Sequence, residues 1–127
     1  MEPSDIFVVD DDRGIRETLG DVLRDEGYQV QLARDGGEAL SLLRQSARPE
    51  LILLDLSMPG MTGLEFRREQ LGDQRLAHIP VVVLSADEKN PLPDVAGWLR
   101  KPVDLHELLR AVSELKLHEP RGRASSK

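Results

Sequence analysis

The stretch that decides the fold runs from residue 51 to residue 63 and begins with the apolar run Leu51-Ile52-Leu53-Leu54. A short apolar run without alternation is typical of a strand that is covered on both faces of a parallel sheet. The run ends at Asp55, and the turn-rich segment Ser57-Met58-Pro59-Gly60-Met61-Thr62-Gly63 follows. This stretch therefore predicts a buried strand with a carboxylate at its carboxyl end.

Four other segments are expected to be strands, and three of them also end at charged or hydroxyl-bearing residues. They are Ile6-Phe7-Val8-Val9 before Asp10-Asp11-Asp12, Tyr28 to Leu32, Val81-Val82-Val83-Leu84 before Ser85, and Trp98-Leu99-Arg100 before Lys101-Pro102. Apolar residues at helical spacing predict helices between and after them. These are Ile15, Leu19, Val22 and Leu23; Ala39, Leu40, Leu42 and Leu43; Leu64 to Leu71; and Leu105, Leu108, Leu109, Val112 and Leu115.

Local signals indicate where these helices begin and end. Asp12 is expected to be the N-cap of the first helix, and Gly27 to end it. The second helix is expected to begin after Gly36-Gly37 and to end before Pro49. The last helix is expected to open at Asp104, three residues before a glutamate, which resembles a capping box.

The alternation of strands and helices predicts an α/β fold, a doubly wound, five-stranded parallel sheet with helices on both faces. Ligands of such sheets bind at the carboxyl ends of the strands. The acidic run at 10–12, Asp55, Ser85 and Lys101 all stand at these ends. We therefore expect them to meet at one edge of the sheet.

Composition restricts the chemistry. The chain has 127 residues, enough for one domain, and we expect the domain to span residues 1–117 and a disordered tail to span 118–127. A net charge of −6 argues against a basic surface for nucleic acid. The absence of cysteine excludes thiol catalysis and Cys-ligated zinc. No apolar run is long enough to span a membrane, and we expect a cytoplasmic protein.

Three carboxylates brought together at one edge repel one another, so the cluster requires a cation. Oxygen ligands favour a hard ion such as Mg²⁺, which typically keeps several waters and also binds phosphate oxygens. Lys101 supplies a positive charge and Ser85 a hydroxyl for a phosphoryl group. Phosphorylation of an aspartate is a known form of nucleophilic catalysis.

Four motifs stand in order at the strand ends: Val8-Val9-Asp10-Asp11, Leu53 to Gly63, Val83-Leu84-Ser85-Ala86 and Lys101-Pro102. Together they resemble the receiver domain of bacterial two-component response regulators, over about residues 5 to 117. The resemblance is to a stand-alone, chemotaxis-regulator-like receiver and implies a flavodoxin-like fold.

The resemblance implies that Asp55 accepts a phosphoryl group from the phosphohistidine of a sensor histidine kinase or phosphotransfer protein. It implies that Asp10 and Asp11 hold Mg²⁺, together with Asp55 and the backbone carbonyl of Ser57. The protein would catalyse its own phosphorylation and dephosphorylation and would not be a turnover enzyme on other substrates.

The resemblance also implies that Ser85 and Lys101 contact the phosphoryl oxygens and that Ser85 and Trp98 report modification as switch residues. A cis Lys101-Pro102 bond is compatible with this family. Because no output domain is expected after residue 117, we expect the effector to be another protein, unless the chain is a phosphate relay or sink.

One segment departs from the family pattern. Residues 86–97 are barely enough for a crossover with a helix, which needs at least about 10–12 residues. Pro91 and Pro93 lie within this segment and do not suit a helix interior. We expect the fourth helix of the family to be shortened to one turn, with Asn90 as cap and Gly97 as stop, or to be absent.

Two other functions remain open. A pseudo-receiver would bind partners without being phosphorylated. A haloacid-dehalogenase-type phosphatase would use Asp10 as nucleophile in an Asp-x-Asp motif, but this reading leaves Asp55 unexplained. Trp98 could equally be a partly buried packing aromatic.

Overall fold

The computed structural model describes residues 5–45, 49–56, 61–86, 92 and 94–115. These residues form one five-stranded parallel sheet in the order β2-β1-β3-β4-β5, with four helices around it. The elements are β1 (Ile6–Val9), α1 (Arg13–Asp25), β2 (Val30–Ala33), α2 (Gly36–Gln45), β3 (Leu51–Asp55), α3 (Gly63–Leu71), β4 (Val81–Ser85), β5 (Gly97–Arg100) and α4 (Leu105–Leu115).

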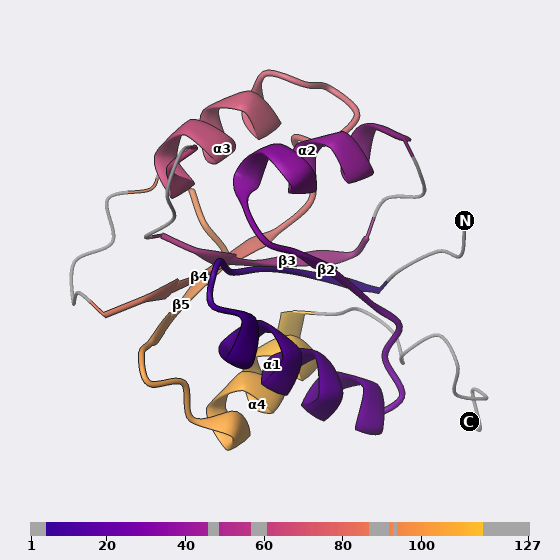
Figure 1. Ribbon diagram of the computed structural model, residues 1–127. Coiled ribbons are helices and arrows are strands. Elements are labelled where there is room, and N and C mark those ends of the chain that lie inside the picture. The colour runs from indigo at the N-terminus through magenta and orange to yellow at the C-terminus, as the bar shows by residue number, and fades with distance from the viewer. Residues whose placement is uncertain (1–4, 46–48, 57–60, 87–91, 93, 116–127) are drawn as a thin grey trace.

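The sheet separates two apolar layers (Figure 1). Helices α2 and α3 cover one face, where they pack on residues such as Phe7, Ile52 and Val83. Helices α1 and α4 cover the other face, over residues such as Val8 and Leu53. Since successive side chains of a strand point to opposite faces, the central strands are buried on both sides. The predicted doubly wound α/β fold is confirmed.

Most element boundaries agree with the sequence, and two differ for local reasons. Helix α2 begins at Gly36 because the side chain of Asp35 accepts a hydrogen bond from the backbone of Glu38 at 2.8 Å and so caps the helix. Strand β2 begins at Val30, since the backbone N–H of Tyr28 still bonds Leu23 O in the turn that ends α1.

The predicted caps are present. Asp12 accepts a hydrogen bond from the backbone N–H of Ile15 at 3.0 Å and begins α1. Gly27 has φ 98°, in the left-handed region that glycine adopts at no steric cost. Asp104 accepts from the backbone N–H groups of His106 and Glu107 at the start of α4.

Between β4 and β5 the described residues contain no helix, as the short crossover predicts. Residues 87–91 and 93, including the expected cap Asn90, lie outside the described residues.

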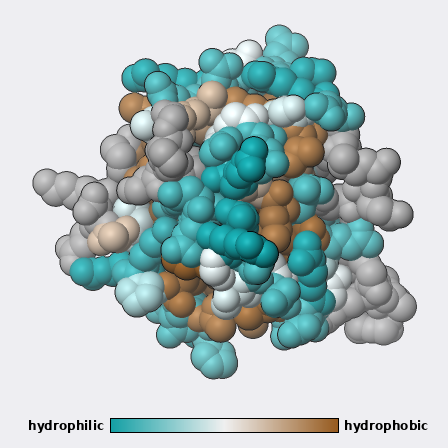
Figure 2. Space-filling view, in the orientation of Figure 1, coloured by the Kyte–Doolittle hydropathy of each residue, from teal (hydrophilic) through white to brown (hydrophobic). Residues whose placement is uncertain are grey.

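Figure 2 shows that hydrophilic side chains dominate the face of the molecule seen in the orientation of Figure 1, with apolar surface visible in patches between them. Within the described part of the chain, every helix is too short or too polar to cross a membrane.

Candidate phosphoacceptor site

The site is built from the carboxyl ends of four strands. Asp10 follows β1 and Asp55 is the last residue of β3, next to it in the sheet. Ser85 is the last residue of β4, and Lys101 follows β5. The backbone N–H of Lys101 donates to Ser85 O at 2.8 Å, which ties these two strand ends together. The sheet thus brings the predicted residues to a single edge.

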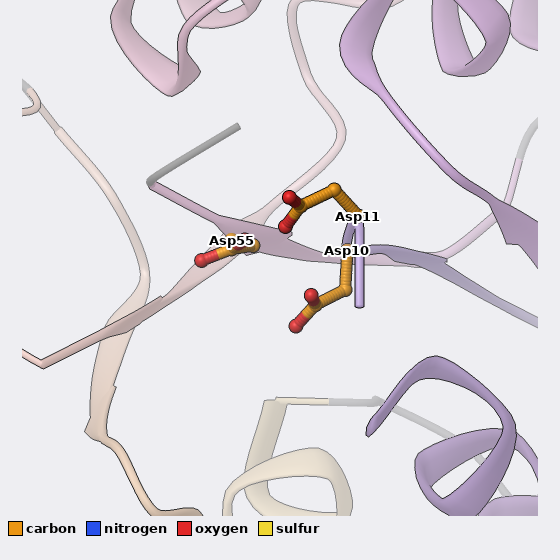
Figure 3. Close-up of side chains that lie close together, drawn as sticks. All are labelled: Asp10, Asp11 and Asp55. Atoms are coloured by element: carbon orange, nitrogen blue, oxygen red, sulfur yellow. The ribbon is translucent and has the colours of Figure 1, made fainter. Parts of the chain in front are cut away.

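Three carboxylates converge there, as Figure 3 shows for Asp10, Asp11 and Asp55. One oxygen of each lies within 4.8 Å of the others. Asp10 is fully buried and Asp55 is 2% exposed, whereas Asp11 is exposed. The site therefore combines two buried acidic groups with one that faces solvent.

Lys101 is the cation of this cluster. Its Nζ donates a hydrogen bond to Asp55 Oδ1 at 2.9 Å and lies 3.3 Å from Asp10 Oδ2. Burial by itself lowers the pKa of Lys101, but the hydrogen bond to Asp55 and the charges of Asp10 and Asp55 outweigh burial and raise this pKa above its ordinary value. Lys101 is therefore positively charged at neutral pH.

Two hydrogen bonds, from the backbone of Asp12 and from the side chain of Arg16 in α1, set the position of Asp10. Its Oδ1 accepts from the backbone N–H of Asp12 at 2.9 Å, and its carbonyl accepts from Arg16 Nη1 at 2.8 Å. These two bonds leave Asp10 Oδ2 to the site. Oδ2 is buried and accepts no hydrogen bond within the described residues, although the Lys101 charge is nearby.

This donor set fits a hard divalent cation. All three side chains offer carboxylate oxygens, and the buried Asp10 Oδ2 has capacity for a further partner. Among the residues that the structure describes, Asp10, Asp11 and Asp55 are the one group of three potential ligands this close together. Ser57, predicted to contribute a carbonyl, lies outside the described residues.

The two predicted switch residues are placed differently. Ser85 is 5% exposed and stands beside the end of β3, where Leu56 N bonds Leu84 O. Trp98 is half-buried in β5 and packs against the apolar layer of α2 and α3. Its indole Nε1 is buried and has no hydrogen-bond partner among the residues that the structure describes. The Lys101-Pro102 peptide bond is cis, in agreement with the resemblance.

Comparison with known proteins agrees with this geometry. The family profile of the response regulator receiver domain matches residues 6–113. The chain belongs to this family. It is thus a receiver domain of two-component signalling, and such domains are not turnover enzymes toward other substrates.

Curated relatives include the response regulator MprA of Mycolicibacterium vanbaalenii, 42% identical over 122 residues, which cover 89% of this chain and 50% of the relative. The MprA protein of Mycobacterium tuberculosis (strain ATCC 25618 / H37Rv) is 40% identical over 129 residues, with coverage of 95% and 54%. The chain spans about half the length of these relatives.

Solved structures show the same fold. The chemotaxis protein CheY4 of Vibrio cholerae matches with a TM-score of 0.81 and 30% identity, over 91% of this chain and 100% of that one. The receiver domain of a histidine kinase from Syntrophus aciditrophicus matches with a TM-score of 0.80 and 30% identity, over 95% and 98%.

Sequence analysis did not predict that two polar residues of α3, Arg67 and Gln70, are buried. They occupy the buried face of the helix together with Gly63 and Phe66. The signal available was their spacing, since residues three and four apart share a helix face. No neighbouring residue in the sequence distinguished Arg67 and Gln70 from two polar side chains that face solvent.

Proposed function

We propose that Asp55 is the phosphoacceptor and receives a phosphoryl group from the phosphohistidine of a sensor histidine kinase or phosphotransfer protein. The observation that carries this proposal is the arrangement around its carboxylate. Asp55 ends a fully buried strand, its Oδ1 lies 2.9 Å from Lys101 Nζ, and carboxylate oxygens of Asp10 and Asp11 lie within 4.8 Å.

In the transfer, a carboxylate oxygen of Asp55 bonds to phosphorus and the P–N bond breaks, with its electron pair remaining on the imidazole nitrogen. The Lys101 ammonium, now bonded to Asp55 Oδ1, then donates to a phosphoryl oxygen instead. Ser85 donates its hydroxyl to a second phosphoryl oxygen. Both groups stand on strand ends, so they are held in place before the reaction begins.

Asp10, Asp11 and Asp55 would hold Mg²⁺, with the Ser57 carbonyl as a further ligand. The ion would supply positive charge to the transferring phosphoryl oxygens. Asp10 contributes Oδ2, which its other contacts leave to the site. Asp11, being exposed, contributes an oxygen from the solvent side. The same residues would support hydrolysis of the phosphoaspartate, so that the domain reverses its own modification.

Modification is proposed to change partner binding through Ser85 and Trp98, and the protein is proposed to act in the cytoplasm. The receiver domain is proposed to span residues 1–117, with 118–127 as a tail. Limited proteolysis followed by intact mass tests this boundary, and cleavage within residues 6–113 under mild conditions would contradict it.

The central experiment is intact mass after incubation with Mg²⁺ and a small phosphodonor such as acetyl phosphate. We expect the mass to rise by one phosphoryl group and the Asp55→Asn variant to remain unmodified. Asp21→Asn, which changes an exposed carboxylate of α1, is the matched control and should be modified like the wild type.

Other outcomes would contradict the proposal in distinguishable ways. Absence of modification with every phosphodonor and with a phosphohistidine donor would favour a pseudo-receiver. Multiple-turnover hydrolysis that depends on Asp10 and persists in Asp55→Asn would favour a phosphatase. Omission of Mg²⁺ should slow modification, and an unchanged rate in chelator would contradict the metal site.

A further inference from the structure

We propose that Arg67 of α3 is a positioning residue, which holds the entry of β5 and thereby places Trp98 and Lys101. The part of this inference that concerns phosphorylation rests on the function proposed above. The part that concerns the unmodified protein does not.

The guanidinium of Arg67 is buried between α3 and the chain that leads into β5. Arg67 is 4% exposed, although arginine is rarely buried without partners. Its Nη1 donates to Gln70 Oε1 at 2.8 Å and its Nη2 donates to the backbone carbonyl of Asp94 at 2.8 Å. One planar group thus joins two segments that are 27 residues apart in sequence.

Gln70 extends this contact to the chain that leads into β4. Its Nε2 donates to Leu76 O at 3.0 Å and to Ile79 O at 2.9 Å. Gln70 is fully buried, so each of these bonds replaces water at a buried carbonyl. Arg67 and Gln70 together form a buried polar brace that ties α3 to the entries of both β4 and β5.

Asp94 has a backbone conformation that requires support from neighbouring groups. It has φ 54°, a left-handed conformation that is uncommon for residues other than glycine. Two residues later, Ala96 N bonds Val81 O at 2.8 Å, and β5 begins at Gly97. The bond from Arg67 to the Asp94 carbonyl therefore fixes the turn that sets the position of β5.

Strand β5 is short and lies at the edge of the sheet, where it pairs with β4 alone among the described strands. It carries Trp98 and leads directly to Lys101, whose Nζ contacts Asp55. A displacement at Asp94 would be transmitted along four strand residues to this ammonium. Because a misplacement of about 1 Å can reduce a rate about 100-fold, we expect loss of the brace to slow phosphorylation of Asp55.

The other end of α3 lies against Leu56, the residue that follows Asp55. Gly63 N bonds Leu56 O at 3.3 Å, and a Cβ on Gly63 would lie 2.9 Å from Leu56 Cδ2 and 3.1 Å from its Cα. Leu56 directly follows Asp55. One helix therefore contacts both the residue after Asp55 and, through Arg67, the turn before β5.

The test compares Arg67→Gln with Arg68→Gln, which removes the same charge from the exposed face of the same helix. Arg67→Lys is a second variant that keeps the charge but loses the planar two-armed donor, and it carries the test if the glutamine variant does not fold. Circular dichroism establishes folding, and hydrogen–deuterium exchange and Trp98 fluorescence are then measured without phosphodonor.

In Arg67→Gln we expect amides of residues 96–101 to exchange about tenfold or more faster, with Trp98 emission shifted to longer wavelength. Arg67→Lys should change in the same direction but less, and Arg68→Gln should match the wild type. Unchanged exchange in both Arg67 variants would overturn the proposal. An increase spread evenly over β1, β3 and β5 would also overturn it, because Arg67 would then support the whole domain.

The effect on the reaction is measured with acetyl phosphate and Mg²⁺. At saturating donor, Arg67→Gln should be modified about tenfold more slowly, with half-saturation within about twofold of wild type. An unchanged rate would overturn the link to Lys101. If the wild type itself is never modified, the proposed function has failed, and exchange and fluorescence alone decide whether Arg67 positions β5.

Discussion

Replacing Asp10 by asparagine should make the protein more stable when no divalent cation is present. Asp10 is fully buried within a cluster that contains three carboxylates and one lysine. Asparagine keeps the shape of the side chain and the Oδ1 that accepts from Asp12 N. The substitution therefore removes the negative charge and replaces Oδ2 with an NH2 group.

The magnitude follows from the distances. At an effective dielectric constant of about 20, the 3.3 Å approach of Lys101 Nζ to Asp10 Oδ2 is worth about 5 kcal/mol of attraction. Repulsion from Asp11 and Asp55, at 4.8 Å or less, is at least about 3.5 kcal/mol each, or about 7 kcal/mol together. Solvent screens the exposed Asp11, whereas burial of the Asp10 charge adds a further cost, so we expect a gain of about 2 kcal/mol.

The assay is urea unfolding at pH 7 in chelator, followed by Trp98 fluorescence and circular dichroism. Asp10→Asn should raise the free energy of unfolding with an unchanged m-value. Asp21→Asn, on the exposed surface of α1, should stay within about 0.5 kcal/mol of the wild type. Unfolding of Asp10→Asn at lower urea than the wild type, with equal m-values, would refute the reasoning, because the attraction to Lys101 would then dominate.

The same variant tests the cation site. Mg²⁺ at ten times its Kd should stabilise the wild type by about 1.4 kcal/mol, because it binds the folded state alone. Asp10→Asn should lose most of this stabilisation. An equal response of both proteins to Mg²⁺ would show that the ion binds elsewhere.

Three further predictions concern the scaffold. Hydrogen bonds from Arg75 lower the pKa of Asp73 to about 2, so this carboxylate stabilises the fold above its ordinary pKa and loses that effect as pH falls to about 2. The Tm difference between wild type and Asp73→Asn should therefore shrink between about pH 4 and pH 2, and a difference independent of pH would contradict it. Gly63→Ala should destabilise by about 1–3 kcal/mol in urea unfolding, since its Cβ would meet the Cα of Leu56 at 3.1 Å as well as that side chain. Thr62→Ala removes the N-cap and capping box of α3 and should cost about 1 kcal/mol in the same assay, with Thr62→Ser close to wild type.

The sequence predicted that Asp10, Asp55 and Lys101 lie close together because the signals for the strand ends are local. Each strand is a short apolar run, and the residue at its end carries the chemistry, as with Asp55 after Leu51–Leu54. In a parallel sheet the carboxyl ends of all strands lie at the same edge, and the order β1-β3-β4-β5 places these particular ends side by side. Proximity of Asp10, Asp55 and Lys101 therefore required the boundaries of β1, β3 and β5, which were predicted to within a residue, and the strand order, which the family resemblance implied.

The features that the sequence did not predict are one local helix cap and contacts between distant segments. The sequence predicted that α2 begins after Gly36-Gly37, but the side chain of Asp35 caps the helix, which begins two residues earlier, at Gly36. Arg67 reads locally as a charge on a polar helix, yet its partner is a backbone carbonyl 27 residues away. A backbone carbonyl has no sequence signature, so no pattern in the chain indicates such a bond.

The site is linked to the rest of the fold both through its own strands and through helix α3. Asp10 and Asp55 follow or end fully buried strands, so their carboxylates cannot separate to relieve repulsion. A change of charge at Asp55 acts directly on Lys101, whose Nζ contacts Asp55 Oδ1, and through Lys101 on the short edge strand before it. That strand is held at its entry by Arg67, from the helix whose first residue bonds the carbonyl next to Asp55. Asp55 and β5 are thus connected both directly through Lys101 and indirectly through α3, and a variant that breaks only the second connection separates their contributions.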